Sequence, residues 1–468
     1  MANRNIGRLI AGSSWLGRTR YLFLIIVTFF SLYASPAEFP IKISGNGRYF
    51  VDQHDTPFFI HSDTPWSLLV ALDTSETAYY FKHRREQGFN AVTVNLIEHW
   101  FNGETLAYPS ASMNKAGDYP FRKYLPADIA DFTSPNEDYF AHVDRVFKIA
   151  LRYGFLVMIT PAYLGYDAEG LQEGWYREVL ENGAERCREY GRFLGKRYAN
   201  YPNIVWIMDG DRNPDNFSRS LEKELILGIK EFDANHLFTA HCHPANSSRD
   251  QWEGESWLNF NSVYTYSFLP DNSFVHEQCI RSYISSPAMP TFLFETCYEN
   301  EHNSTALQIR SQMYWGWLCS IAGVQFGNLP VWRFGAGWQK ALGWQGSCDA
   351  AIMKKMVDSR NWYKLVPDYQ HIAVVDGYGS KETFVAAALT NNRETLIAYI
   401  PNGTAIWVDL NQISGKKIVV WWFNPRNGLS NRADEFTEKQ NVKFIPPDSK
   451  DWLLVIDDAA YQFGPPGK

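Results

Sequence analysis

The sequence predicts an α/β protein in which a (β/α)8 TIM barrel is followed by a small antiparallel β-sandwich. Two observations carry this prediction. Between residues 58 and 326, eight short apolar runs alternate with helix-like stretches, which is the pattern of parallel strands with helical crossovers. From about residue 363, short runs separated by turn residues replace that pattern, as in antiparallel sandwiches. A chain of 468 residues has room for both units.

The first 37 residues have the pattern of a signal peptide. Arginines precede an apolar run at 21–33, and small residues suited to cleavage follow at 35–37. The run is shorter than the ~20 residues that span a bilayer. We therefore expect residues 1–37 to direct export to the periplasm, the cell surface or the medium. An uncleaved leader would instead leave the protein attached to a membrane.

The eight barrel strands are predicted at 58–62, 91–97, 156–161, 204–208, 237–241, 260–266, 291–294 and 323–326. Helices are predicted at 75–87, 136–153, 185–199 and 218–235. Gly88 and Gly154 stand where a glycine would end a helix before the next strand. A doubly wound open sheet is the alternative, but no Gly-rich phosphate loop follows any of the predicted strands.

The C-terminal part is predicted to form strands at 384–389, 394–400, 405–409, 417–423, 442–445 and 452–455. We place the catalytic domain at 38–362 and the β-sandwich at 363–468. Trp407, Trp421 and Trp422 in the sandwich could stack on sugar rings. Packing in the sandwich core is the interpretation that we favour for them.

The composition excludes some partners. The net charge is −7, whereas phosphate binding requires a basic surface, so no nucleic-acid partner is expected. The 17 Trp and 26 Tyr suit either an aromatic core or a sugar-binding site. The six cysteines lack the paired spacing of a metal site, and their disulfide pairing cannot be deduced from sequence.

Two carboxylates are placed for glycoside hydrolysis. Asp211 follows the fourth predicted strand and Glu295 follows the seventh. Both strand ends open on one face of a barrel, and a retaining glycosidase needs two carboxyl groups about 5–5.5 Å apart there. We predict Glu295 as nucleophile and Asp211 as acid/base. Asp209 could exchange roles with Asp211, and either aspartate could simply cap the next helix.

Further polar and aromatic residues stand near the ends of predicted strands. Asp209 is expected to raise the pKa of Asp211 by like-charge repulsion, and Arg212 to position that carboxylate. Candidate sugar contacts, with Asp209 and Arg212 included, are Asp63, Trp66, Asn95, His99, Tyr163, Tyr264, Tyr266 and, in a supporting role, Glu299. A helix cap at Asp63 and core packing of Trp66 are the structural alternatives.

Other chemistries find little support. His241 and His243 form an H-x-H pair, but no cluster with metal-ligand spacing accompanies it. No G-x-S-x-G motif occurs, so a serine esterase is not indicated. We predict no metal and no cofactor, and a carbohydrate substrate as the partner.

Four motifs in order carry a family resemblance. They read FFIHSDTPWSLL, RREQGFNAVTVNLIEHWF, PNIVWIMDGDRNP and FLFETCYE. Together they resemble the apiosidase-like glycoside hydrolases, that is, glycoside hydrolase family 140 and its relatives, over about residues 43–457. The C-terminal WWFNPRNG and PPDSKDWLLVID resemble the β-sandwich that trails this family and has been labelled collagen-binding.

The resemblance implies a barrel and a two-carboxylate retaining mechanism. It also implies an acid/base matching Asp211, a nucleophile matching Glu295, and release of apiose from the side chains of the pectin rhamnogalacturonan-II. The chain departs from the family by having Asp209, Ser62 and Phe294 where glycine is usual. Phe294 directly precedes the predicted nucleophile. Tyr264-Thr265-Tyr266 replaces a Gln-Ser-Gly-His-like segment. The fold and mechanism should therefore carry over better than the sugar.

Two rivals belong to other classes. One is a non-catalytic carbohydrate-binding protein on a degenerate barrel, but retention of both carboxylates argues against it. The other is an adhesion protein that acts through its β-sandwich, which binding by residues 365–468 alone would favour.

Overall fold

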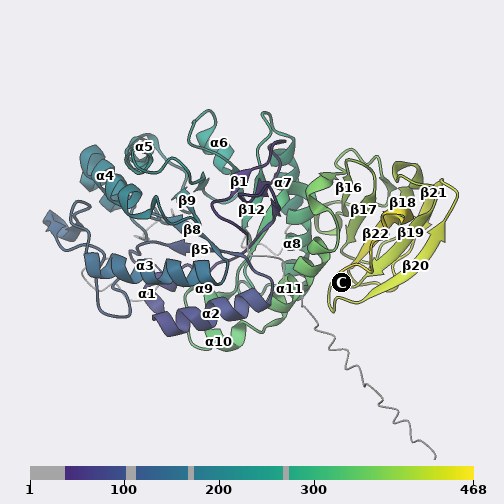
Figure 1. Cartoon of the computed structure of the whole chain (residues 1–468), viewed down its shortest axis with the longest axis horizontal. Coiled ribbons are helices and arrows are strands. Elements are labelled where there is room, and N and C mark those ends of the chain that lie inside the picture. The colour runs from purple at the N-terminus through teal and green to yellow at the C-terminus, as the bar shows by residue number, and fades with distance from the viewer. Residues whose placement is uncertain (1–36, 102–111, 167–172, 267–273) are drawn as a thin grey trace, which may run out of the picture. The chain divides into compact units, whose positions relative to one another are not determined.

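Eight parallel strands form the central sheet of the barrel (Figure 1). In chain order they are β4 (Ile60–Asp63), β5 (Ala91–Asn95), β8 (Leu156–Thr160), β9 (Ile204–Asp209), β10 (Phe238–His241), β11 (Asn261–Tyr264), β12 (Thr291–Glu295) and β13 (Ile321–Phe326). Each overlaps a strand predicted from the sequence. The computed structural model describes residues 37–101, 112–166, 173–266 and 274–468, so the predicted signal peptide lies almost wholly outside the described residues.

The sheet is nearly closed. Its hydrogen-bonded order runs β10-β9-β8-β5-β4-β13-β12-β11, which leaves β10 and β11 as neighbours at the seam. There the backbone N–H of Asn259 donates to the carbonyl of Phe238 at 3.0 Å, and Thr239 Oγ1 donates to the carbonyl of Phe260 at 2.8 Å. The predicted fold class, a (β/α)8 barrel followed by a β-sandwich, is confirmed.

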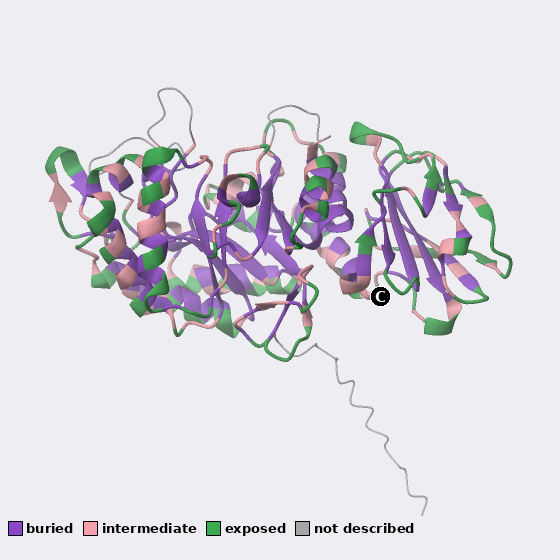
Figure 2. Cartoon of the chain, turned by 90° about the horizontal axis from the view of Figure 1, so that it is seen from above, coloured by how far each residue is buried: buried purple, intermediate pink, exposed green. Residues whose placement is uncertain are grey.

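Barrel strands are buried throughout, as continuous apolar runs predict (Figure 2). All six residues of β9 are buried, including Asp209 at its carboxyl end. Polar residues at the carboxyl ends of these strands therefore lie between the apolar core and the face of the barrel on which catalytic residues are found.

Helices pack around the strands. The longer ones are α2 (Thr74–Glu86), α3 (Glu137–Arg152), α4 (Tyr176–Tyr198), α5 (Asn216–Lys230), α7 (Phe274–Ile284), α8 (Ala306–Ser320) and α11 (Gln345–Asp358), and the short ones are α1 (Leu68–Ala71), α6 (Ser248–Trp252), α9 (Leu329–Trp332) and α10 (Trp338–Ala341). Among the described residues, no helix combines the length and apolar character needed to span a bilayer.

Local chemistry explains the helix ends. Asp73 caps α2 in a capping box with Glu76, and Asn136 caps α3. Gly88 and Gly154 follow these two helices with φ of 83° and 74°, as predicted. Helix α4 begins before the predicted residue 185 because Gly183, at φ 67°, interrupts it without ending it.

The C-terminal region has a six-stranded antiparallel sheet. Its strands, in sheet order, are β14 (Leu365–Pro367), β16 (Ala386–Thr390), β17 (Thr395–Ile400), β22 (Trp452–Asp458), β19 (Ile418–Phe423) and β20 (Ser430–Phe436). Strand β20 was not predicted, because it is an exposed, polar edge strand without an apolar face. The predicted domain division at 362/363 falls between α11 and β14.

A second sheet of three strands completes the sandwich. It consists of β15 (Val374–Asp376), β18 (Ile406–Asp409) and β21 (Asn441–Phe444). Trp422 is buried in the sandwich core, as favoured, whereas Trp407 on β18 is 39% exposed.

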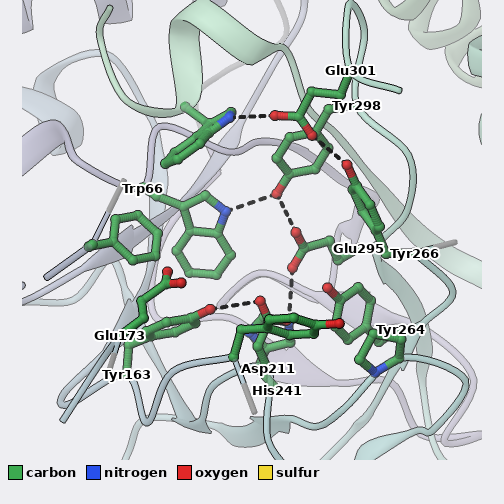
Figure 3. A pocket seen from close by; sticks show the side chains of 14 residues that line it. Trp66, Tyr163, Glu173, Asp211, His241, Tyr264, Tyr266, Glu295, Tyr298 and Glu301 are labelled. Atoms are coloured by element: carbon green, nitrogen blue, oxygen red, sulfur yellow. Dashed lines mark hydrogen bonds and ion pairs between the residues drawn. The ribbon is translucent and has the colours of Figure 1, made fainter. Parts of the chain in front are cut away.

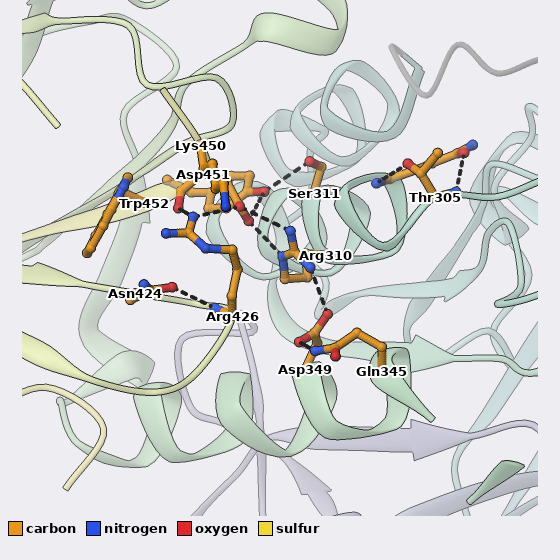
Figure 4. A network of polar contacts seen from close by, with 12 residues as sticks. Thr305, Arg310, Ser311, Gln345, Asp349, Asn424, Arg426, Lys450, Asp451 and Trp452 are labelled. Atoms are coloured by element: carbon orange, nitrogen blue, oxygen red, sulfur yellow. Dashed lines mark hydrogen bonds and ion pairs between the residues drawn. The ribbon is translucent and has the colours of Figure 1, made fainter. Parts of the chain in front are cut away.

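The barrel and the sandwich share one hydrophobic core along α8. That core includes Tyr314 of α8 and Tyr399 of β17, whose rings stack with centroids 4.8 Å apart. Beside them, Arg310 donates to Asp451 of the sandwich at 2.8 Å and to Asp349 of α11 at 3.0 Å (Figure 4). The sandwich is therefore packed against the barrel through both apolar and ionic contacts.

Candidate active site

A cavity of about 290 Å³ lies where the barrel strands end. Fourteen residues line it (Figure 3). They are Trp66, Phe101, Tyr163, Tyr166, Glu173, Asp211, His241, Pro244, Tyr264, Tyr266, Glu295, Tyr298, Glu301 and Trp332. An aromatic wall with a few polar groups is a surface suited to a sugar ring, which has both C–H faces and hydroxyl edges.

Asp211 enters the cavity from the turn after β9. Asp209, Gly210 and Asp211 all have positive φ, at 62°, 140° and 48°. A Cβ on Gly210 would lie 2.3 Å from the ring of Tyr163, so only glycine fits between β9 and that ring. The turn brings Asp211 Oδ2 to 2.7 Å from the hydroxyl of Tyr163, which donates to it.

Glu295 is the last residue of β12 and is 6% exposed. The hydroxyl of Tyr298 donates to its Oε1 at 2.6 Å. Trp66 Nε1 donates to that same hydroxyl at 2.8 Å. This chain of donors fixes the orientation of the Glu295 carboxylate without neutralising it.

His241, the last residue of β10, lies between the two carboxylates. Its Nε2 is 3.1 Å from Asp211 Oδ1 and 2.9 Å from Glu295 Oε2. The indole of Trp66 stacks on the imidazole, with centroids 5.6 Å apart and an interplanar angle of 15°. One oxygen of each carboxylate and the imidazole nitrogen all lie within 4.8 Å of one another. The carboxylates are thus closer than the ~6.5–9.5 Å of inverting glycosidases.

These contacts control protonation. Burial alone would lower the pKa of His241, but the carboxylates of Asp211 and Glu295 raise it to about 9. Burial raises the pKa of Glu295, and the charge of Asp211 adds to this, while His241 and Tyr298 offset part of it. At neutral pH the imidazole is therefore a cation held between two acids.

Asp211 has a pKa below its usual range. Burial acts to raise it, but the charge of His241 and hydrogen bonds from His241, Tyr163 and Tyr264 outweigh burial. The prediction that Asp209 raises this pKa is wrong. Asp209 is fully buried beneath the turn, where Trp252 Nε1 donates to its Oδ2 at 2.5 Å, and burial raises its own pKa to about 7.

Four of the predicted sugar contacts line the cavity, namely Trp66, Tyr163, Tyr264 and Tyr266. Both predicted catalytic residues line it too. Because Asp211 faces the cavity and Asp209 does not, the geometry separates two aspartates that the sequence could not.

Asp63 and His99 lie outside the lining. Asp63 is fully buried, and Arg84 Nε and the Tyr80 hydroxyl each donate to its Oδ2 at 2.6 Å, so this carboxylate joins β4 to α2. His99 is 4% exposed, with Nε2 2.7 Å from Glu178. Neither residue is among those that line the cavity, and sugar contact at both positions stays a prediction.

Asn95, Arg212 and Glu299 are also not among the residues that line the cavity. Asn95 is the last residue of β5 and is 1% exposed. The guanidinium of Arg212 packs over the ring of Tyr176, 4.1 Å from its centroid. Glu299 accepts hydrogen bonds from Gly346 N and Asn328 Nδ2, both at 2.7 Å, and thereby ties the segment after β12 to the start of α11 and to the residue before α9.

Sequence reasoning missed Glu301 as a lining residue. It accepts a hydrogen bond from Trp332 Nε1 at 2.7 Å and another from the hydroxyl of Tyr266. Its position six residues after Glu295 was a usable signal, but Glu299 in the same loop was chosen instead. Nothing in the pattern decides which of these glutamates turns inward.

Glu173, Tyr298 and His241 were missed as well. Glu173 precedes α4, and burial together with the charge of Asp211 raises its pKa to about 7. His241 was considered only as a metal ligand. Asp211, His241 and Glu295 do have ligand-like spacing among the described residues, so the absence of a metal stays a prediction.

Comparison with known proteins assigns both parts of the chain. The family model described as "Apiosidase-like, catalytic domain" matches residues 44–364. The model described as "Putative collagen-binding domain of a collagenase" matches residues 366–457. No curated protein sequence matches the chain.

Solved structures resemble nearly the whole chain. A glycoside hydrolase family 5 protein from Bacteroides vulgatus superposes with a TM-score of 0.76 at 22% identity, covering 90% of this chain and 94% of its own. Another structure, described as a glycoside hydrolase, has the same TM-score and identity and covers 91% and 98%. At this identity the likeness shows the fold.

Proposed function

The chain belongs to the apiosidase-like glycoside hydrolases, and from that premise we propose an exported retaining enzyme that removes side-chain sugars from polysaccharides. Pectin carrying apiose is the first substrate class to test. The observation that carries the retaining mechanism is the placement of Asp211 and Glu295 on either side of His241, with carboxylate oxygens within 4.8 Å. That spacing suits direct attack by one carboxylate.

In the first step, Glu295 attacks the anomeric carbon while Asp211 protonates the departing glycosidic oxygen. The C–O bond to the leaving group breaks as the bond to Glu295 forms, giving a glycosyl-enzyme. In the second step, Asp211 takes a proton from water, which attacks the same carbon and releases Glu295. The orientation of Glu295 by Tyr298 supports its assignment as the nucleophile.

His241 supplies the proton that Asp211 needs. In the free pocket that proton resides on the imidazole, because the pKa of His241 is raised to about 9 and that of Asp211 is lowered. Nε2 and Asp211 Oδ1 are 3.1 Å apart, which is within reach for transfer when substrate displaces the ion pair. His241 is thus the group that protonates Asp211 before Asp211 acts as the acid.

Export rests on the N-terminal arginines and apolar run. The sandwich is assigned a supporting role in this proposal, because it shares a core and buried ion pairs with α8. Binding to collagen is not needed to account for it.

The test is hydrolysis of a glycan panel that includes rhamnogalacturonan-II oligosaccharides. Purified residues 38–468 are compared with Glu295→Gln and Asp211→Asn, and with Glu185→Gln as an exposed control on α4. Release of a sugar by the wild type and the control, lost in both site variants, is the expected result. Undiminished release by Glu295→Gln would show that the site is assigned incorrectly.

A further inference from the structure

The lining of the cavity carries four carboxyl groups and one imidazole. Glu173, Asp211, Glu295 and Glu301 supply the acids and His241 the cation, and the described lining contains no Lys or Arg. Two carboxylates suffice for the chemistry. Glu173 and Glu301 are therefore acidic groups that catalysis does not explain.

Glu301 is held in place by its neighbours. Trp332 Nε1 donates to Oε1 and the Tyr266 hydroxyl to Oε2, so each oxygen keeps a free lone pair (Figure 3). Both donors are themselves lining residues. The carboxylate is thus fixed against the aromatic wall and can accept hydrogen bonds from two neighbouring hydroxyls of a ligand.

Glu173 is fixed by the backbone around it. Gly174 N donates to the carbonyl of His99 at 2.8 Å, and Trp175 N donates to that of Tyr163 at 2.7 Å. A Cβ on Gly165 would lie 1.7 Å from the carbonyl oxygen of Glu173, so the two segments are in close contact. This packing anchors the backbone that carries Glu173 at the edge of the cavity near Asp211.

We propose that the pocket selects a neutral sugar and excludes uronates and other anionic sugars, with Glu301 and Glu173 as acceptors for its hydroxyls. This inference rests on the proposed glycosidase function and deepens it by naming the substrate class. A carboxylate on the sugar would face Asp211, Glu295 and Glu301, and also Glu173, which is partly ionised at neutral pH because its pKa is raised to about 7. The one cation of the described lining, His241, is already paired with two of these acids. Sugar hydroxyls, in contrast, are donors that fixed carboxylates bind well.

Arginines near the site do not change this balance. Arg333 packs against the ring of Trp332, 5.7 Å from its centroid, and Arg212 packs over Tyr176. Neither belongs to the described lining. The segments 102–111, 167–172 and 267–273, which the structure does not describe, contain no Lys or Arg in their sequence.

The test is calorimetric binding of free monosaccharides to residues 38–468 at pH 7. Galactose and galacturonate form one matched pair, glucose and glucuronate another, and apiose, xylose and arabinose extend the neutral set. We expect neutral sugars to bind and each uronate to bind about a hundredfold more weakly or not at all. Glu301→Gln should weaken neutral-sugar binding by about tenfold or more, and Glu185→Gln should not.

Each outcome separates the two proposals. A uronate that binds as tightly as its neutral partner overturns the inference, and the glycosidase proposal then stands or falls by its own glycan panel. Unchanged neutral-sugar binding in Glu301→Gln overturns the role of Glu301. If no free sugar of either kind binds, the inference of neutral-sugar selection is overturned, and the glycosidase proposal is still decided by its glycan panel.

Discussion

His241 Nε2 lies 2.9 Å from Oε2 of Glu295, a carboxylate at the end of a different barrel strand. This contact places a cation beside a buried acid, and without that cation the pKa of Glu295 would be higher. Because the same nitrogen also faces Asp211, the imidazole keeps two like charges close together in a buried site.

Replacing His241 with Gln should raise the pKa of both carboxylates. The imidazole cation lowers each of them now, and a neutral amide would not. We expect the acidic limb of the kcat/KM profile to move up by about 1–3 pH units and kcat/KM at its optimum to fall by about tenfold or more. The measurement is a pH–rate profile on whichever glycan the panel identifies.

The matched control is His243→Gln, the other histidine of the H-x-H pair, which lies outside the lining. Its pH profile should follow the wild type. An acidic limb that stays in place in His241→Gln would contradict the assigned electrostatics.

Stability should depend on pH through the same group. The pKa of His241 is raised from 6.5 to about 9 on folding, so the native state binds this proton more tightly than the unfolded chain does. The resulting stabilisation, on the order of 3 kcal/mol, is fully present below pH 6.5 and is lost as the pH rises through about 9. Urea unfolding of the wild type and His241→Gln should differ more at pH 6 than at pH 9.5. A difference that grows with pH would contradict this sign.

Tyr298→Phe should impair catalysis while leaving the fold intact. The substitution keeps the ring but removes the donor to Glu295 and leaves Trp66 Nε1 without its acceptor. We expect kcat to fall by about tenfold to a hundredfold, the equivalent of one charged hydrogen bond. Tyr190→Phe removes a buried hydrogen bond to the Pro161 carbonyl between two residues that do not line the cavity, so it is the control and should retain kcat. Equal kcat in the two variants would contradict the role of Tyr298.

Asp451→Asn should loosen the sandwich from the barrel. Asp451 is 1% exposed and accepts from Arg310 at 2.8 and 3.1 Å and from Arg426 at 3.0 Å. Breaking such a buried pair costs about 3–5 kcal/mol of unfolding free energy. Asp434→Asn on the exposed edge strand β20 should cost almost nothing. A small loss in Asp451→Asn would indicate that the shared apolar core alone joins the two parts.

The barrel was predictable because several of its strands, such as β8, β9 and β12, are short apolar runs that end at a polar residue. Asp211 and Glu295 follow directly from that pattern, since strand ends of a closed sheet must meet. Strand β20 was not predictable, because its polar sequence is stabilised only by pairing with β19.

The surroundings of the catalytic pair were less predictable. Asp63 and His99 stand near strand ends, as catalytic groups do. In the structure, however, Asp63 contacts Arg84 and His99 contacts Glu178, and both partners come from other elements. Those partners are brought close only by the packing of helices, which sequence spacing does not encode. Glu173 and Glu301 come from loops, where no periodicity tells inward from outward side chains.

The central claim is that Asp211 and Glu295 act as a retaining pair, and the most direct test is the anomeric configuration of the first product. The released sugar is followed by proton NMR from the start of hydrolysis, before mutarotation mixes the anomers. Release with the configuration of the substrate is the predicted result, because two displacements at one carbon restore it. Release of the opposite anomer would contradict the account, since it requires a water between carboxylates that here both contact His241.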